Sequence, residues 1–282
     1  MVSGNDSAVA LAEFISDNIS NFSDSMNNKA IKLGLNSSHF TSPHGLDHEN
    51  HYTTAFELAL LTDYALKNDL FLKIVSTKNY TIMINNNPKN LSNTNELLGF
   101  MDGVYGVKTG FTNGANRCLV SAYKNNNLDI ICVVLGCDTK KNRTQDSINL
   151  INYIINNFSV INIEYIINNN FNEWVKNNSS SFNIIKGTSK NLELKLDEKQ
   201  IIYKEIPIHK KYTDTIQTLI QIQDSFQAPI ISETIVGKLN VQTNESTLFT
   251  VNILAKNTIK RKNIFNYIDE FIKILNTSFF KS

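Results

Sequence analysis

Apolar residues recur at intervals of three and four in several parts of the chain. The stretches with this helical spacing are 7–20, 24–33, 53–67 and 144–158. In the last of these, Ile148, Ile151 and Ile155 fall on one face. A polar stretch over 37–52 contains Pro43 and Gly45, which favour loops over regular structure. The pattern therefore predicts four helices in the first 158 residues, with a loop after the second.

Between 104 and 135 the hydrophobic period changes to two. The segments with this alternation are 104–109, 118–123 and 128–135, and each is predicted to be a strand. Asn125, Asn126 and Asn127 lie between the last two segments, and Asn tolerates the positive φ of a hairpin turn. The segment from 85 to 95, with Pro88 and many Asn residues, reads as a loop.

After residue 159 short apolar runs follow one another at regular intervals. The runs that read as strands are 161–167, 182–186, 192–196, 201–208, 215–222, 235–241 and 247–254. Many short strands at such spacing favour a small all-β domain. We therefore place a domain boundary near 159.

The last segment, 262–282, has a different pattern. Its apolar residues are Ile264, Ile268, Phe271, Ile272, Leu275 and Phe279. They form one stripe of a helix, with Asp269 and Lys273 away from it. From this pattern two interpretations stand: a helix lying in a membrane surface, or a terminal helix docked on its own domain or on a partner.

Composition excludes several classes of protein. The chain has 282 residues, of which 41% are hydrophobic and 19% charged, and its net charge of +1 lacks the basic excess of a nucleic-acid binder. No run of 18 apolar residues occurs. Three cysteines, Cys118, Cys132 and Cys137, do not form a disulfide framework, and whether Cys118 and Cys132 pair is left open.

Two short motifs carry candidate chemistry. In Lys108-Thr109-Gly110, on a predicted strand, a cation and a hydroxyl could meet the carboxylate of a peptide that adds to the strand edge. Ser3 and Asn5, two apart on a short loop, could relay a proton and hold a substrate carbonyl. Each motif alone is also compatible with an ordinary strand end or turn.

Taken together, and in order, these motifs resemble the low-molecular-weight D-alanyl-D-alanine carboxypeptidases, penicillin-binding proteins of serine peptidase family S11. The segments that carry the resemblance are 3–8, 26–30, 33–35, 39–47, 51–55, 106–112, 117–122, 228–230 and 236–237. The resemblance implies an α/β fold: part of a penicillin-binding, β-lactamase-like transpeptidase domain with helices on an antiparallel sheet (1–158), a β-rich domain (159–258) and an amphipathic tail helix (259–282). It makes a membrane-surface anchor the better interpretation of the tail.

The resemblance also implies an activity without a cofactor or a metal. A serine one helical turn before a lysine would attack the D-Ala-D-Ala terminus of a peptidoglycan pentapeptide, and β-lactam antibiotics would acylate the same serine. On this sequence Ser3 would relay protons, Asn5 would hold the substrate amide, and Lys108 and Thr109 would receive the carboxylate. Gly110 would leave the strand open, and the backbone N–H of Phe111 would donate to the oxyanion. The implied location is the periplasmic face of the cytoplasmic membrane.

The sequence departs from the family pattern in its first motif. Ser-x-x-Lys occurs only at 121–124, on a predicted strand, and at 278–281, in the tail. Residues i and i+3 of a strand point to opposite faces, so Ser121 and Lys124 are not expected to cooperate. No signal peptide is visible before Ser3 either. We therefore expect this chain to be the C-terminal part of a longer carboxypeptidase.

Two other readings remain. The cluster His44, Asp47, His48 and His51 has the residue types of a zinc site, but it lacks the His-Glu-x-x-His spacing and lies in a loop. Alternatively, the chain is a non-catalytic or vestigial envelope protein that binds peptide, partner or membrane without cutting. A smaller departure is Asn116, where the family often has Gly, and Asn can adopt the same left-handed backbone.

Overall fold

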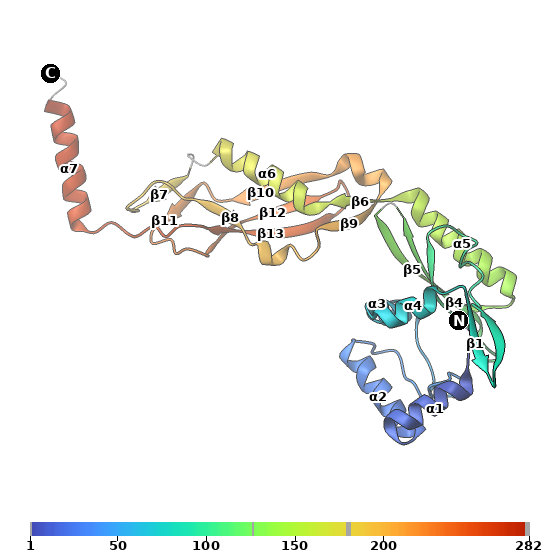
Figure 1. Cartoon of the computed structure of the whole chain (residues 1–282). Coiled ribbons are helices and arrows are strands. Elements are labelled where there is room, and N and C mark those ends of the chain that lie inside the picture. Colours follow the sequence, from blue (N-terminus) through green and yellow to red (C-terminus); the bar gives the residue numbers. More distant parts are fainter. Residues whose placement is uncertain (1, 126, 179–181, 280–282) are drawn as a thin grey trace. The chain divides into compact units, whose positions relative to one another are not determined.

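The computed structural model describes residues 2–125, 127–178 and 182–279, and the chain divides into two compact units, Met1–Asn157 and Phe158–Ser282 (Figure 1). Each unit has its own hydrophobic core. The first unit combines helices with an antiparallel sheet, and the second is mainly β-structure. The fold class expected from the sequence is confirmed.

A three-stranded antiparallel sheet organises the first unit. Its strands are β3 (Val104–Thr112), β4 (Asn116–Asn125) and β5 (Leu128–Cys137), in that order across the sheet. Asn125 pairs with Leu128, and Asn127 has a φ of 67°, so the turn falls where the Asn run predicts it, with Asn126 outside the described residues. The sequence places all three strands correctly.

Helices cover both faces of this sheet. Helix α5 (Lys140–Asn157) packs Ile151 against Leu119 and Val134 on one face. Helix α4 (Asp69–Ser76) places Val75 against Val107 and Ala122 on the other face, and α3 (Ala55–Leu66) lies beside β5 (Figure 1). Because the side chains of a strand alternate between faces, a register slip of one residue would expose both cores.

The first predicted helix is divided in two. The structure has α1 (Asn5–Ser16) and α2 (Ile19–Lys32), where the pattern predicts one helix over 7–20 and a second starting at 24. Asp17 ends α1 with a φ of 66°, and the Asn18 side chain accepts a hydrogen bond of 2.8 Å from the backbone N–H of Asn21. Asp and Asn thus end one helix and cap the next, which overrides the continuous apolar spacing.

Two elements between 67 and 95 were not predicted, and the loop predicted from 85 to 95 is wrong over 87–92, which form a strand. Helix α4 continues the helical region, and a hairpin of β1 (Asn79–Ile84) and β2 (Asn87–Ser92) follows. Asn85 and Asn86 connect these strands and both have positive φ, which suits a two-residue hairpin turn. Pro88 is tolerated because this hairpin pairs only with itself in the described chain, so Pro88 lies on an edge strand.

The second unit combines three sheets with one packed helix within the described residues. A four-stranded sheet has the order β10 (Gln217–Ile222), β12 (Ile235–Gln242), β13 (Thr247–Ala255), β8 (Leu194–Leu196). Smaller pairs are β6 (Phe158–Asn162) with β9 (Glu205–His209) and β7 (Asn183–Ile185) with β11 (Ser225–Gln227). Two short 3₁₀ helices, η1 (Glu198–Gln200) and η2 (Lys210–Thr215), complete the unit. That makes three sheets within the described residues, with α6 (Ile163–Asn178) packed beside them.

The strand predicted over 161–167 is wrong beyond its first two residues. Helix α6 begins at Ile163, and the Asn162 side chain accepts a hydrogen bond of 2.8 Å from the backbone N–H of Tyr165. Ile163, Ile167 and Phe171 are buried at intervals of four and enter the core of the second unit. Several isoleucines lie close together in 161–167, and this short run by itself is typical of a strand. Over the longer segment up to Phe171, however, the buried apolar residues recur every four positions, which is typical of a helix.

The tail forms helix α7 (Ile264–Phe279). Its apolar side chains are exposed, including Ile268 and Phe271, and Lys262 just before it pairs with Glu270 at 2.5 Å. Among the described residues, no helix has the length and apolar character needed to cross a membrane. The end of the tail, 280–282, lies outside the described residues.

The side chain of Asn95, which precedes β3 in the sequence, makes a hydrogen bond to that strand. Asn95 is 2% exposed, and its Nδ2 donates to the carbonyl oxygen of Gly106 at 2.7 Å. Its Oδ1 accepts from the backbone N–H of Leu97 at 3.1 Å. Through these two hydrogen bonds Asn95 holds its own segment, including Leu97, in a defined position beside β3.

Replacing Asn95 with Ala should destabilise the chain. The change leaves the buried Gly106 carbonyl and the Leu97 N–H without these partners, which we expect to lower the free energy of unfolding by about 1–3 kcal/mol. Urea denaturation measures this. Asn90→Ala, on the exposed strand β2, is the control and should change the value by less than about 0.5 kcal/mol. Equal losses for the two variants would contradict the assignment.

Candidate active site

One cavity of the first unit gathers residues from distant parts of the sequence. Its volume is about 1220 Å³. The stretches that line it come from residues 2–8, 43–46, 93–96, 108–118 and 140–143. All six candidate residues are among them: Ser3, Asn5, Lys108, Thr109, Gly110 and Phe111. The sequence motifs, far apart along the chain, therefore share one cavity.

The edge of β3 forms one wall of this cavity. Within the described chain β3 pairs with β4 alone, so the backbone groups of its outer edge are available to an extended ligand. Lys108 Nζ donates to the carbonyl oxygen of Thr109. Desolvation lowers the pKa of Lys108 from its ordinary value. A Cβ at Gly110 would meet only Cys118 at an ordinary 3.7 Å, so glycine here leaves the edge open without being required by packing.

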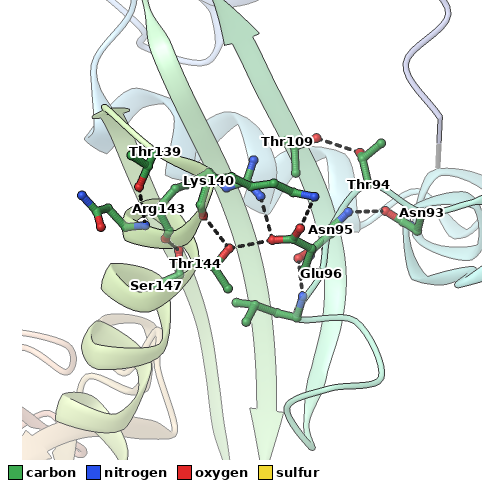
Figure 2. A network of polar contacts seen from close by, with 12 residues as sticks. Asn93, Thr94, Asn95, Glu96, Thr109, Thr139, Lys140, Arg143, Thr144 and Ser147 are labelled. Atoms are coloured by element: carbon green, nitrogen blue, oxygen red, sulfur yellow. Dashed lines mark hydrogen bonds and ion pairs between the residues drawn. The ribbon is translucent and has the colours of Figure 1, made fainter.

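The Thr109 hydroxyl is already engaged. Its Oγ1 lies 2.7 Å from Oγ1 of Thr94, and Figure 2 shows the two side chains turned toward each other. One of the two hydroxyls donates this hydrogen bond and the other accepts it. A ligand carboxylate at Thr109 would therefore meet a hydroxyl whose orientation Thr94 constrains.

Ser3 and Asn5 reach the cavity from the start of α1. Gly4 is the N-cap residue, and the backbone N–H of Ala8 donates to its carbonyl oxygen at 3.0 Å. Ser3 therefore precedes the helix and Asn5 is its first residue, so the two side chains are carried by a helix start rather than by a free loop. Both are exposed.

The loop that contains Pro43 and Gly45 is joined to the end of β3. Asp47 Oδ2 accepts from the backbone N–H of Gly114 at 2.9 Å. A hydrogen bond from Thr112 and then that from Gly114 lower the pKa of the Asp47 carboxyl. Across the same turn, the Arg117 guanidinium lies 4.4 Å from the ring centre of Phe111. The Phe111 ring therefore packs against the Arg117 guanidinium near the end of β3.

The histidines near this loop make hydrogen bonds of their own. His44 Nδ1 lies 3.1 Å from Ser42 Oγ, and His51 Nδ1 lies 3.1 Å from Thr41 Oγ1. Burial is the main cause that lowers the pKa of His51, which favours the neutral ring. Among the residues that the structure describes, no group of three His, Cys, Asp or Glu side chains could hold a metal ion.

Sequence reasoning missed a charged network at one end of the cavity. Glu96 lies beside the first turns of α5, where its carboxylate pairs with Lys140, accepts from Arg143 Nη2 at 3.3 Å and accepts from Thr144 Oγ1 at 2.8 Å (Figure 2). Glu96, Lys140 and Arg143 all line the cavity. Because 47 residues separate Glu96 from Arg143, no local motif marks the pair.

The two Ser-x-x-Lys strings have different positions. Ser121 is fully buried on β4, its hydroxyl has no hydrogen-bond partner in the described chain, and Lys124 pairs with Asp129 at 3.0 Å on the surface. The two side chains diverge as the strand period requires, and neither lines the cavity. The second string, 278–281, lies outside the residues whose side chains the structure describes.

The three cysteines are free thiols. Cys132 is buried on β5 opposite Ser121, whereas Cys118 lines the cavity, so these two residues are not paired. Burial raises the pKa of the Cys132 thiol to about 11. Cys132 therefore stays protonated and acts as a small apolar side chain.

Family models match both units. Residues 1–139 match the D-alanyl-D-alanine carboxypeptidase family, and residues 173–261 match the C-terminal domain of penicillin-binding protein 5. Both matches agree with the resemblance seen in the sequence.

Individual relatives extend the match along the chain. The D-alanyl-D-alanine carboxypeptidase DacF of Bacillus subtilis is 30% identical over 273 residues, which cover 95% of this chain and 66% of that protein. The Haemophilus influenzae enzyme DacA is 31% identical over 277 residues, 96% of this chain and 66% of its own length. The chain thus spans about two thirds of these relatives.

A solved structure agrees in fold. Penicillin-binding protein 5 from Haemophilus influenzae superposes with a TM-score of 0.68 at 28% identity, over 92% of this chain and 72% of that one. Together with the two family models, the cavity and its motifs, this match shows that the chain belongs to the D-alanyl-D-alanine carboxypeptidase family.

Proposed function

We propose that the cavity binds the D-Ala-D-Ala terminus of a peptidoglycan stem peptide in the removal of its last D-Ala. The observation that supports this is the convergence of Ser3 and Asn5 with the open edge of β3 in one cavity. An extended peptide can add to such an edge through its main chain, and side chains beside the edge then select its terminus.

Each candidate residue has a task in this proposal. Lys108 and Thr109 receive the terminal carboxylate through charge-assisted hydrogen bonds. Asn5 holds the penultimate amide, and Ser3 relays a proton toward the leaving amine. The backbone N–H of Phe111 donates to the carbonyl oxygen that becomes negative during attack, which is worth about 3–4 kcal/mol in comparable sites.

The proposed reaction passes through a covalent ester. A serine Oγ attacks the carbonyl carbon of the penultimate D-Ala while a lysine accepts its proton, the C–N bond breaks, and D-Ala leaves with a proton on its amine. Water then adds to the ester and releases the shortened peptide and the serine. In this proposal the attacking serine and the lysine that accepts its proton are the two residues of the family's Ser-x-x-Lys motif. β-Lactams would acylate the Oγ of the same serine.

The position of Ser121 favours a second candidate function for the 282-residue chain. Its hydroxyl is buried away from the cavity and Lys124 is paired elsewhere. For this chain acting alone we therefore propose recognition of the peptide without cleavage, as a non-catalytic envelope component. In both functions the place of action would be the periplasmic face of the cytoplasmic membrane.

Peptide binding tests the proposal directly. An acetylated tripeptide that ends in D-Ala-D-Ala should bind the full chain more tightly than the same peptide with a C-terminal amide, as measured by titration calorimetry. Lys108→Ala removes the charge that faces the carboxylate and should weaken binding at least about tenfold. Lys67→Ala, which removes an exposed lysine paired with Asp63, should leave binding unchanged.

The pH dependence of the same binding gives an internal check. Desolvation lowers the pKa of Lys108, so its charge is lost at a lower pH than in an ordinary lysine. Affinity should therefore fall as pH rises through this lowered pKa, while Lys108→Arg keeps its charge and extends binding to higher pH. Equal binding of the acid and the amide would refute the proposal.

Labelled penicillin separates cleavage from recognition. Since neither Ser121 nor Lys124 lines the cavity, we expect no adduct on the 282-residue chain that survives denaturation. Ser121→Ala should give the same result, and reversible binding of penicillin should remain in both. An adduct that mass spectrometry locates on any serine of the wild-type chain would establish a nucleophile and exclude the purely non-catalytic function.

We further propose that α7 holds the chain at a membrane surface. Its exposed apolar side chains include Ile264, Ile268, Phe271 and Ile272, and Asp269 and Lys273 lie away from this stripe. The basic group Lys260, Arg261 and Lys262 precedes the helix and can meet anionic head groups.

Flotation with vesicles that contain phosphatidylglycerol tests this anchor. The full chain should float, and Ile268→Asp combined with Phe271→Asp should remove most of the floating fraction, because two charges would then enter the apolar layer. Asp269→Asn combined with Lys273→Gln is the matched control on the polar side and should still float. Equal flotation of both double variants would rule the anchor out.

A further inference from the structure

A small cavity of the second unit lies between α6 and β10. Its volume is about 270 Å³. Helix α6 packs beside β10 (Figure 1), and the described residues that line the cavity all belong to these two elements. Both elements lie in the second unit, so this α6–β10 cavity is contained within that unit.

Regular periods of the helix and the strand form the two walls of the α6–β10 cavity. Asn170, Trp174 and Asn177 follow one another on α6 at intervals of four and three, so they lie on one face of the helix. Thr218 and Ile220 are two apart on β10, so they lie on one face of the strand. The backbone of each element therefore fixes the positions of the lining side chains.

Trp174 gives the cavity a firmly held aromatic surface. Its ring centre lies 6.2 Å from that of Phe182, and both Trp174 and Ile220 pack against the core of the second unit. Trp174 is only half-buried, which leaves part of the residue accessible at the cavity. The face of an aromatic ring is electrostatically negative and attracts C–H groups that neighbouring oxygens polarise. A sugar ring presents such C–H groups on its apolar face.

Amide groups accompany this aromatic surface. Among the described residues, the side chains of Asn170 and Asn177 and the indole N–H of Trp174 make no hydrogen bond to the protein. Asn178 Nδ2 donates to the carbonyl oxygen of Trp174 at 2.9 Å, which holds the end of the helix in place. An amide both donates and accepts hydrogen bonds, as a hydroxyl does, so the two groups can pair in either direction.

The charge and the size of the α6–β10 cavity narrow the choice of ligand. Glu173 is the one charged residue among the described residues that line it. A carboxylate accepts hydrogen bonds from hydroxyls but repels phosphates and other carboxylates, and nucleic acids are bound through cations. Because ligand pockets commonly start at about 300 Å³, this cavity suits a single ring better than a long segment.

We propose that the α6–β10 cavity binds one neutral sugar ring, stacked on Trp174, with its hydroxyl groups paired to the amides of Asn170 and Asn177. Glycans of N-acetylated hexosamines and glucans share this chemistry. The inference goes beyond the proposed function, because it assigns a ligand to the second unit and does not depend on the cavity of the first unit.

The fluorescence of Trp174 tests the proposal in the full chain. Trp174 is the single tryptophan of the sequence, so its emission reports on this cavity alone. Tri-N-acetylglucosamine and maltotriose are titrated separately, with excitation that avoids tyrosine. We expect a saturable change in emission with at least one of the two, and the tighter binder identifies the kind of glycan. No saturable change with either sugar would overturn the proposal.

Asparagine variants locate the sugar. Asn170→Ala and Asn177→Ala each remove an amide that pairs with the ring and should weaken binding about fivefold. Alanine has a higher helix propensity than asparagine, so α6 should keep its structure in both variants.

Asn172→Ala is the matched control on the same helix. Asn172 is exposed and lies two positions from both Asn170 and Trp174, on the other side of α6, so its loss should leave the affinity unchanged. Equal weakening in Asn172→Ala, or unchanged affinity in both Asn170→Ala and Asn177→Ala, would refute the inference.

Peptide binding separates this inference from the proposed function. Asn177→Ala should bind the acid form of the D-Ala-D-Ala peptide as the wild-type chain does, because Asn177 lies in the second unit. If the wild-type chain binds a sugar but neither form of the peptide, the proposed function fails and the sugar site stands. If it binds the peptide but neither sugar, the sugar site fails and the proposed function stands.

Discussion

The pairing of β3 with β4 is the constraint on which the cavity depends. It satisfies one edge of β3, and no strand of the described residues pairs with the other edge, beside which Lys108 and Thr109 line the cavity. Lys108 pairs with Val120, which in turn pairs with Val133 on β5, so the edge strand is anchored through the full width of the sheet. Helices α4 and α5 then fix the register from both faces, since each packs against alternate residues of the strands.

The electrostatics of the cavity follow from where its cations are attached. Lys108 is carried by a strand, and Arg143 is carried by a helix that packs on the same sheet. A buried guanidinium needs a compensating charge, and Glu96 supplies it from the segment that precedes β3. The position of Arg143 and the stability of its buried charge therefore depend on the same acid, Glu96.

Sequence reasoning predicted elements well where one period continued over many residues. The three strands between Val104 and Cys137 are of this kind, and a left-handed backbone at Asn116 was anticipated and is observed at a φ of 55°. It failed where side-chain capping decided the outcome, as at Asn18, and where a run rich in isoleucine concealed a helix, as at Ile163. The network around Glu96 was beyond its reach, because tertiary packing alone brings that acid to Arg143.

Asparagine replaces glycine at several turns of this chain. Among the described residues, Asn85, Asn86, Asn116 and Asn127 all have positive φ without being glycine. An Asn in this conformation has a higher energy in the folded chain than a glycine would have. In the unfolded chain, however, Asn explores fewer backbone conformations than glycine, so less entropy is lost when the turn forms. The hairpins of this protein therefore owe part of their stability to the restricted freedom of the disordered chain, a contribution that no contact in the folded structure reveals.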